Sequence, residues 1–352
     1  MVLIVSASIL AFMVSVGLTP LVKKIAYKRD WVARINHRTI HQIPIPLLGG
    51  TAVFLAYLAG ILLVYIFAGG QYEELLKENL SFVLGGSIIL ILGIYDDIRG
   101  ASSYQKFICQ ILASIIVITL GYKISAIVNP FGGVIELGIW SIPITIFWLV
   151  AISNAFNLID GLDGLASGIG LGAALTMMFV SLWSNNYISA LPAGILAASI
   201  AGFLIFNFNP AKIFLGDSGS LVIGFWLACF SINGTFRSES AVAILIPIIV
   251  FSLPILDTFM AFFRRVRKGI HPFKADKKHI HHRLLYIGLS QRQAMLLLSG
   301  VSSFWGLLAF GMVALGNQSF VPFTLIVLAT IFFGLKHIKR LTTNHSIKSQ
   351  NN

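Results

Sequence analysis

Eleven long apolar runs constrain the fold of this chain more than any other feature. Hydrophobic residues make up 57% of its 352 residues and charged residues only 11%, whereas a soluble domain carries about 25% charged residues. The runs are unbroken rather than alternating with a period of two, so they predict helices, in which each backbone polar group is satisfied within the segment. We therefore expect an all-α polytopic membrane protein with about eleven transmembrane helices. The expected spans are 1–22, 48–68, 79–95, 105–121, 139–156, 165–183, 188–206, 219–236, 241–263, 294–315 and 320–336.

The basic residues give these helices an orientation. With eleven spans, all but three of the 25 Lys and Arg fall on one side of the membrane, and the exceptions are Lys77, Lys123 and Arg237. Basic loops mark the cytoplasmic side, so we expect the N-terminus outside and the C-terminus in the cytoplasm. The same loops explain the net charge of +12, because they face anionic lipid and phosphate-rich solutes. Membrane lipid is therefore an expected partner, and a nucleic acid is not.

The runs form one unit. We expect a single integral-membrane domain over residues 1–340 and a mobile polar cytoplasmic tail over 341–352. Residues 122–138 contain Gly and Pro between two apolar runs, which indicates an external hairpin. Cys109 and Cys229 lie inside apolar runs, so they are expected to be membrane-buried thiols without a disulfide framework.

The segment 154–168 is polar where its neighbours are apolar. Its Asn and Asp residues recur every third position, so in a helix each would share a face with the next. One helix cap needs one such residue, not four, and polar groups at membrane depth are costly unless they line a site. Gly161 and Gly164 either break the helix or let a ligand approach the backbone. The four residues, Asn154, Asn157, Asp160 and Asp163, are predicted to form the floor of a site.

Two further motifs carry carboxylates at helix ends. Asp96 and Asp97 are adjacent, so they require a cation, a proton or a basic partner nearby, unless they lie in a solvated loop. Asp217 precedes an apolar run within the segment 214–220. Glycines flank it and would suit a backbone that turns beside a phosphate or a metal, although a capped loop is the alternative.

The last motif lies in the longest polar loop, 264–292. A basic run that includes Arg265 precedes His279, His281, His282 and Arg283. Several His residues could suit zinc, but no Cys or Glu is nearby to complete a usual set. Contact with a diphosphate or a sugar is the alternative. Asp257, within the apolar run before this loop, is either a structural or a functional carboxylate.

All these motifs fall on the side that the basic loops assign to the cytoplasm. Independent helix caps would also occur on the outer side, and they do not. Carboxylates, Asn side chains, basic groups and Gly turns together indicate magnesium-assisted chemistry on a phosphorylated solute.

The motifs, in this order, resemble those of the polyprenyl-phosphate N-acetylhexosamine-1-phosphate transferases, of the glycosyltransferase family 4 type. The resemblance runs from the segment Pro-Ile-Pro-Leu-Leu-Gly-Gly at 44–50 to Arg283. The sequence His-Ile-His-His-Arg-Leu at 279–284 looks like the N-acetylglucosamine-1-phosphate branch, whereas the peptidoglycan branch typically has three consecutive His followed by Phe. The match departs after Asp97, where relatives often carry a Lys several residues on. Here the nearest is Lys106, with Arg99 as an alternative partner for the acceptor phosphate.

The resemblance implies a reaction in a bacterial cytoplasmic (inner) membrane, with the site facing the cytoplasm. Undecaprenyl phosphate would attack a UDP-N-acetylhexosamine, UDP-GlcNAc in this branch, to give undecaprenyl-diphosphate-GlcNAc and UMP at the first membrane step of a cell-envelope glycan such as teichoic acid or lipopolysaccharide. It implies Mg²⁺, with Mn²⁺ as a substitute, on Asn157 and Asp217. The implied catalytic residues are Asp96, Asp97, Asp217, His281 and His282. The implied substrate-binding residues are Asn154, Asp160, Gly161, Asp163, Phe214, Lys106, Arg265, His279 and Arg283.

Other readings stay open from the sequence. One is a phospho-N-acetylmuramoyl-pentapeptide transferase. Another is a cation-coupled transporter, which should carry acidic residues near helix midpoints and often shows inverted repeats. The oligomeric state is also open, and a homodimer is compatible with the chain.

Overall fold

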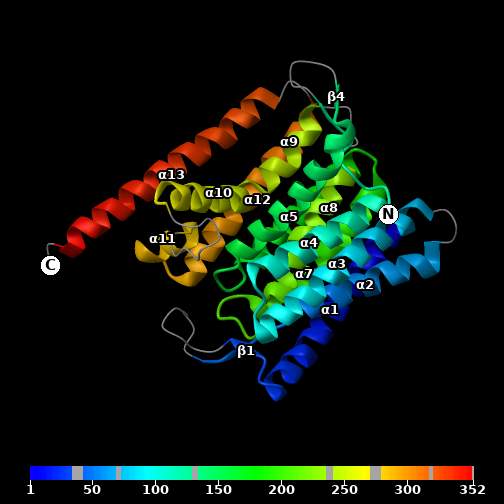
Figure 1. The fold of residues 1–352 in the computed structure, drawn as a ribbon, viewed down its shortest axis with the longest axis horizontal. Coiled ribbons are helices and arrows are strands. Elements are labelled where there is room, and N and C mark those ends of the chain that lie inside the picture. The colour runs from blue at the N-terminus through cyan, green and yellow to red at the C-terminus, as the bar shows by residue number, and fades with distance from the viewer. Residues whose placement is uncertain are drawn as a thin grey trace.

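The computed structural model describes residues 1–33, 43–68, 73–128, 134–234, 241–269, 279–316 and 320–350. Helices dominate these residues and pack as a bundle (Figure 1). The helices are α1 (Val2–Lys28), α2 (Gly49–Ala68), α3 (Glu73–Arg99), α4 (Ser103–Thr119), α5 (Ser141–Ile159), α6 (Leu165–Trp183), α7 (Tyr187–Asn207), α8 (Asp217–Gly234), α9 (Ala241–Val250), α10 (Ser252–Arg267), α11 (Ile280–Tyr286), α12 (Gln291–Leu315) and α13 (Phe320–Gln350). The strands are β1 (Val32–Ala33), β2 (Ile45–Pro46), β3 (Ala126–Val128) and β4 (Val134–Glu136), and a 3₁₀ turn covers Gly138–Trp140.

The all-α polytopic membrane fold is confirmed. Within the described residues, seven helices are long and apolar enough to cross a membrane, and three shorter apolar helices accompany them. Each expected span coincides with a helix or a pair of helices. The number of crossings and the orientation stay predictions.

One expected span differs from the structure. The run 241–263 forms two helices, α9 and α10, separated by a turn at Phe251. Pro254 lies in the first turn of α10, where its missing N–H costs no intrahelical hydrogen bond. A second helix can therefore begin at Ser252 with a new direction, while the hydropathy of the run stays continuous.

The hairpin predicted within 122–138 is present. Strand β3 pairs antiparallel with β4, with Ile127 opposite Ile135. Its position outside the membrane stays a prediction. At the other end of the chain, helix α13 continues to Gln350, so part of the predicted tail is helical, and its mobility stays a prediction.

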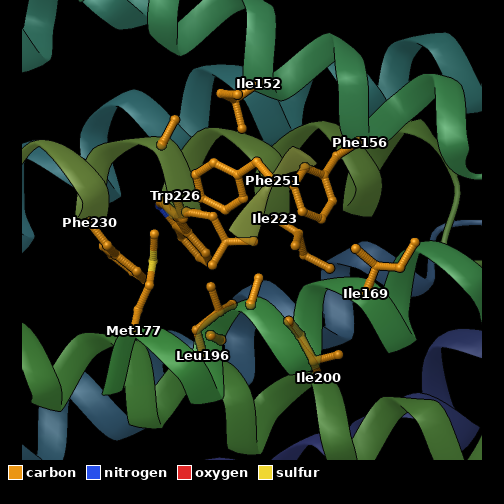
Figure 2. Close-up of a cluster of buried hydrophobic side chains, with 14 of the residues drawn as sticks. Ile152, Phe156, Ile169, Met177, Leu196, Ile200, Ile223, Trp226, Phe230 and Phe251 are labelled. Atoms are coloured by element: carbon orange, nitrogen blue, oxygen red, sulfur yellow. The ribbon is translucent and has the colours of Figure 1, made fainter. Parts of the chain in front are cut away.

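Helix α8 lies at the centre of the bundle. It packs against α3, α5, α2, α6 and α7, and its side chains from Ser218 to Ile232 are buried. Figure 2 shows Trp226 and Ile223 of this helix among apolar side chains from α5, α6 and α7. The ring of Trp226 stacks on Phe54 at 5.0 Å, and its Nε1 donates to the carbonyl of Phe82 at 2.9 Å. A helix that is apolar all round belongs inside a bundle, so the core fixes the place where α8 begins.

Two glycines bring neighbouring helices close to that starting point. A Cβ on Gly50 of α2 would overlap the backbone of Ser218 and Gly219, and a Cβ on Gly93 of α3 would overlap the backbone of Asp217 and Ser218. Close helix approach of this kind requires small residues. The N-terminus of α8 is therefore held between α2 and α3.

Candidate active site

Backbone hydrogen bonds from the 44–50 segment hold the loop that precedes α8. The carbonyls of Phe214 and Leu215 accept hydrogen bonds from the N–H groups of Gly49 and Gly50, at 3.0 and 2.9 Å. The N–H of Phe214 donates to the carbonyl of Pro46 at 2.8 Å. The 44–50 motif therefore supports the backbone that leads to Asp217. The same hydrogen bonds fix the position of the half-buried Phe214.

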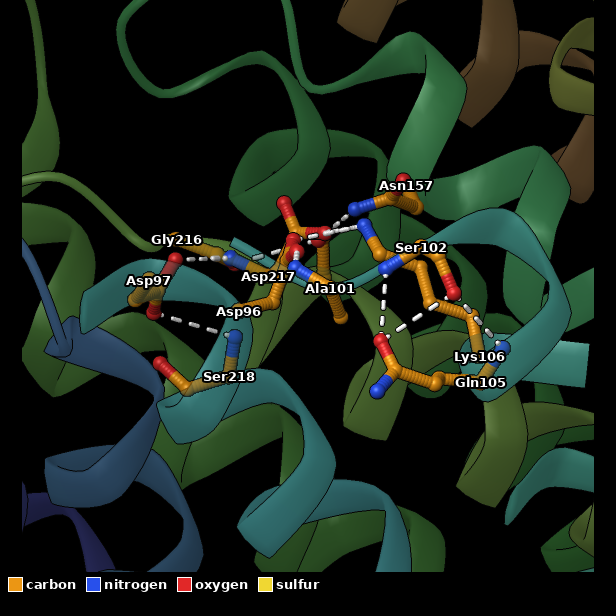
Figure 3. A network of polar contacts seen from close by, with 11 residues as sticks. Asp96, Asp97, Ala101, Ser102, Gln105, Lys106, Asn157, Gly216, Asp217 and Ser218 are labelled. Atoms are coloured by element: carbon orange, nitrogen blue, oxygen red, sulfur yellow. Dashed lines mark hydrogen bonds and ion pairs between the residues drawn. The ribbon is translucent and has the colours of Figure 1, made fainter. Parts of the chain in front are cut away.

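Asp97 caps the first turn of α8. Its Oδ1 accepts from the N–H of Asp217 at 2.8 Å, and its Oδ2 accepts from the N–H of Ser218 at 3.2 Å (Figure 3). These N–H groups have no partner within their own helix. Both carboxylate oxygens of Asp97 are thus engaged in fixing the backbone of Asp217.

Asp96 and Asp217 converge on one lysine. The Nζ atom of Lys106 lies 2.5 Å from Oδ2 of Asp96 and 2.5 Å from Oδ2 of Asp217. Lys106 lies in the first turn of α4. Ser102 and Gln105 form a capping box at the start of this helix. The other oxygen of Asp96 accepts from the N–H of Ala101 at 2.5 Å. The structure therefore places Lys106 between the two predicted carboxylate motifs. The partner of the acceptor phosphate, Lys106 or Arg99, stays a prediction.

The two Asn residues of the opening motif point to different partners. Asn157 donates from Nδ2 to Oγ of Ser220 at 3.0 Å, which places it beside the start of α8 (Figure 3). Asn154 donates to Oε1 of Gln110 at 2.7 Å, and this pair links α5 to α4 inside the bundle. Asn157 thus faces Asp217 across the site, while the amide nitrogen of Asn154 is used between helices.

The predicted shared helical face ends earlier than expected. Helix α5 stops at Ile159, Asp160 adopts a non-helical ψ of 59°, and Gly164 has φ +74°. Asn154 and Asn157 therefore lie within one helix, whereas Asp160 and Asp163 follow its end. Of the two alternatives for Gly161 and Gly164, the structure shows the helix break, because the chain turns into α6 at these glycines.

That turn holds two carboxylates in different settings. Oδ2 of Asp163 accepts from Nδ2 of Asn209 at 2.9 Å and from the N–H of Ala211 at 3.0 Å, so Asp163 fixes the loop between α7 and α8. Burial raises the pKa of Asp160 well above its usual range, and the negative charges of Asp217, Asp97 and Asp163 raise it further. The site is therefore rich in negative charge.

The donor set fits a magnesium ion. Oxygens of Asp96 and Asp217 already converge on one positive group, Lys106 Nζ. The amide of Asn157 lies at the same helix start. Among the described residues, no group of three or more His, Cys, Asp or Glu could hold a metal by itself. Mg²⁺ typically takes one or two carboxylates and completes its shell with water and substrate phosphate. The two carboxylates of this cluster match that number of protein ligands.

His281 and His282 lie on α11, and His279 immediately precedes it, in a segment that the sequence predicted to be loop. The rings of His279 and His281 are parallel within 4°, with centroids 5.7 Å apart, and the ring of His282 lies 4.2 Å from that of His281. A Cβ on Gly161 would overlap Nε2 of His281. The histidine motif therefore packs directly against the turn that carries Asp160.

His281 is neutral. Its pKa is lowered to about 3, mainly by burial. The neighbouring His282 and His279 also lower this pKa, whereas the charge of Asp257 raises it. Its Nδ1 is buried and has no hydrogen-bond partner within the described part of the chain. A nitrogen of a neutral imidazole can donate or accept one hydrogen bond without a change in the charge of the ring.

The remaining predicted residues lie on the two helices that flank the polar loop. Arg265 is in the last turn of α10 and Arg283 is in α11. The segment 270–278 between these helices, with Asp276, falls outside the described residues. The sequence did not indicate the supporting roles of Gln110, Ser220 and Asn209. Gln110 carried a signal, since it is an uncharged polar residue within an apolar run.

Known proteins resemble the chain over most of its length. The family described as Glycosyl transferase family 4 matches residues 79–235. A Bacillus subtilis (strain 168) protein, named as a probable undecaprenyl-phosphate N-acetylglucosaminyl 1-phosphate transferase, is 38% identical over 85% of this chain and 82% of its own. The decaprenyl-phosphate N-acetylglucosaminephosphotransferase of Mycobacterium leprae is 36% identical over 83% of this chain and 79% of its own. The undecaprenyl-phosphate alpha-N-acetylglucosaminyl 1-phosphate transferase of Yersinia pestis is 27% identical over 92% and 88%.

The matched region 79–235 includes α3 to α8. It therefore contains the cluster of Asp96, Asp97, Lys106, Asn157 and Asp217. Sequence similarity and site geometry fall on the same helices. The chain belongs to glycosyl transferase family 4, as a multi-pass bacterial membrane member of the polyprenyl-phosphate sugar-1-phosphate transferases.

Proposed function

We propose that this protein transfers N-acetylglucosamine-1-phosphate from UDP-GlcNAc to undecaprenyl phosphate, releasing UMP. The observation that carries the proposal is the convergence of Asp96 and Asp217 on Lys106 at the buried start of α8. The names of the Bacillus and Yersinia relatives support the same donor sugar and lipid. We place the reaction on the cytoplasmic side of the bacterial inner membrane, at the first membrane step of a cell-envelope glycan such as teichoic acid or lipopolysaccharide.

The transfer exchanges one phosphorus–oxygen bond for another. A phosphate oxygen of the lipid attacks the sugar-side phosphorus of UDP-GlcNAc, the bond from that phosphorus to the bridging oxygen breaks, and UMP leaves with the electron pair. The lipid phosphate is already largely ionised near neutrality, so the reaction needs no strong base. Catalysis of this type depends on positioning and on neutralising charge.

The residues divide these tasks. Lys106, with Asp96 as its partner, would bind the acceptor phosphate as a cation that reaches into the site. Asp217 and the amide oxygen of Asn157 would hold Mg²⁺, or Mn²⁺ in its place, and the bound ion would neutralise the phosphate oxygens of the donor. Asp97 keeps Asp217 in place through the backbone of α8.

The donor would lie between two motifs that pack together. Asp160 and Phe214 would contact the uridine, with Asp163 fixing the adjacent loop. The neutral His281, together with His279, His282, Arg265 and Arg283, would contact the diphosphate and the sugar. Gly161 leaves room for His281 beside the α5–α6 turn. The uridine and the sugar-diphosphate would therefore contact two elements that pack against each other, this turn and α11.

UMP release tests the proposal directly. Purified protein with Mg²⁺ should release UMP from UDP-GlcNAc only when undecaprenyl phosphate is present. In a panel of UDP-sugars, UDP-MurNAc-pentapeptide should give much slower release, because the interrupted histidine motif matches the other branch. Lipid-independent release, or no release from any UDP-sugar, would rule out the transfer, and faster release from UDP-MurNAc-pentapeptide would reassign the donor.

A further inference from the structure

Asp257 is a buried carboxylate with both oxygens engaged. It lies in α10 with 2% of its surface exposed. Its Oδ2 lies 2.7 Å from Nδ1 of His279, and its Oδ1 accepts from the N–H of Ile280 at 2.8 Å. A single side chain thus binds the first histidine of the motif and the first backbone N–H of α11.

This contact sets the protonation of His279. An ionised carboxylate only accepts hydrogen bonds, so Nδ1 of His279 must carry a proton. Nε2 is then the nitrogen left for a ligand, and the plane of the ring is fixed. The choice of tautomer by a partner of the other nitrogen is a general property of imidazole groups in sites.

Contacts lead from His279 to the α5–α6 turn. The ring of His279 is parallel to that of His281, and Nε2 of His281 abuts Gly161. A change in the His279 ring would therefore be transmitted to the histidine that touches the turn of Asp160. Asp257 itself lies on α10, a different helix from the histidines it contacts.

We propose that Asp257 is a positioning residue of the transferase site, which holds His279 protonated on Nδ1 and oriented for the sugar-diphosphate donor. The proposal rests on the proposed function. It assigns Asp257 a role that acts through His279 and does not require Asp257 to touch the substrate.

Asp257→Asn separates this role from simple helix capping. The amide oxygen of the substituted side chain can still accept from the N–H of Ile280. Because a backbone N–H can only donate, this bond fixes which way the amide group is turned. The amide NH₂ then faces Nδ1 of His279 as a donor, so the histidine must move its proton to Nε2. A residue that only caps α11 would tolerate this change, whereas a residue that sets the tautomer would not.

We expect Asp257→Asn to keep the wild-type thermal unfolding temperature and to lose about 10- to 100-fold in kcat/KM for UDP-GlcNAc, which is the usual effect of losing a group that orients a functional histidine. Asp30→Asn is the matched control, since Asp30 is an exposed residue at φ 57° and Asn tolerates that conformation. In ¹⁵N-histidine spectra without substrate, His279 should be protonated on Nδ1 in the wild type and on Nε2 in Asp257→Asn.

Two further variants keep the test decisive if Asp257→Asn folds poorly. In His279→Asn, the amide nitrogen replaces Nδ1–H and retains the Asp257 contact, so this variant should fold and lose activity. Adding Asp257→Asn to His279→Asn, which keeps the acceptor for the N–H of Ile280, should cause little further loss of activity. Wild-type kcat/KM in Asp257→Asn, or independent losses in the double variant, would overturn the positioning role. Inactivity of the wild type would instead contradict the proposed function, and the ¹⁵N spectra would still decide the Asp257–His279 contact.

Discussion

At the scale of single residues, the carboxylates of the site divide into two groups by what their oxygens do. Oxygens of Asp97 and Asp163 accept backbone N–H groups and hold α8 and the preceding loop. Asp96 and Asp217 each direct one oxygen to Lys106, although the other oxygen of Asp96 also accepts from the N–H of Ala101. The first pair stabilises the positions of the backbone, and the second pair presents charge to a ligand.

Lys106 provides a prediction at this scale. In Lys106→Met, the two carboxylates that share its Nζ would face each other without a cation, which costs about 1–3 kcal/mol for a partly exposed group. We expect a lower unfolding temperature in EDTA and a larger rise on adding Mg²⁺ than in the wild type, because the ion can replace the lost charge. Differential scanning fluorimetry in detergent measures both.

Lys28→Met is the control for that experiment, since Lys28 is exposed at the end of α1. It should leave the response to Mg²⁺ unchanged. An equal response to Mg²⁺ in Lys106→Met and the wild type would show that the carboxylates do not share a cation position.

At the scale of elements, the packing around α8 depends on glycine. Gly50→Ala would place a methyl group within the backbone of Ser218 and Gly219. Overpacking of this kind costs about 1–3 kcal/mol, and here it would also displace Asp217. We expect a lower unfolding temperature together with reduced turnover.

Gly17→Ala in α1 is the matched control for Gly50→Ala. No atom lies within 4 Å of the added methyl group, and Ala favours a helix over Gly by about 0.5–1 kcal/mol. It should unfold at the same or a higher temperature with full turnover. Similar behaviour of the two variants would contradict the close approach of α2 to α8.

The sequence predicted the elements better than their interruptions. Hydropathy located the apolar helices because it depends on composition over a window. It missed the break at Phe251, since the residues around the turn are themselves apolar. It also missed α11, which has only seven residues, three of them His or Arg, and which is held by Asp257 of another helix. Tertiary contacts decide such elements, and a single sequence does not contain them in readable form.

The residues that form the site could be predicted from the sequence, but the contacts between them largely could not. Spacing identified Asp96, Asp97, Asn157 and Asp217, and the structure brings them together. It could not tell that Asp97 would cap α8, because this contact joins residues 120 positions apart in the chain. Likewise, Lys106 lies further along the sequence from Asp97 than the Lys of the relatives, but the short link between α3 and α4 brings Lys106 back to Asp96.

At the scale of the whole molecule, the charge distribution predicts an orientation. A fluorescent protein that folds only in the cytoplasm should be bright when fused after residue 352. An alkaline phosphatase, which is active only outside, should be inactive at that position and active when inserted near Lys123 in the β3–β4 region. The reverse pattern would invert the topology and place the site outside.

The central claim is that this bundle transfers a sugar together with one phosphate. UDP-GlcNAc carrying ³²P at the sugar-side phosphorus and ¹⁴C in the sugar distinguishes this from transfer of the sugar alone. With Mg²⁺ and undecaprenyl phosphate, we predict that both labels enter the lipid in equal amounts, that unlabelled UMP appears in the same amount, and that Asp217→Asn abolishes all three. Entry of ¹⁴C into the lipid without ³²P, with labelled UDP released, would contradict the account.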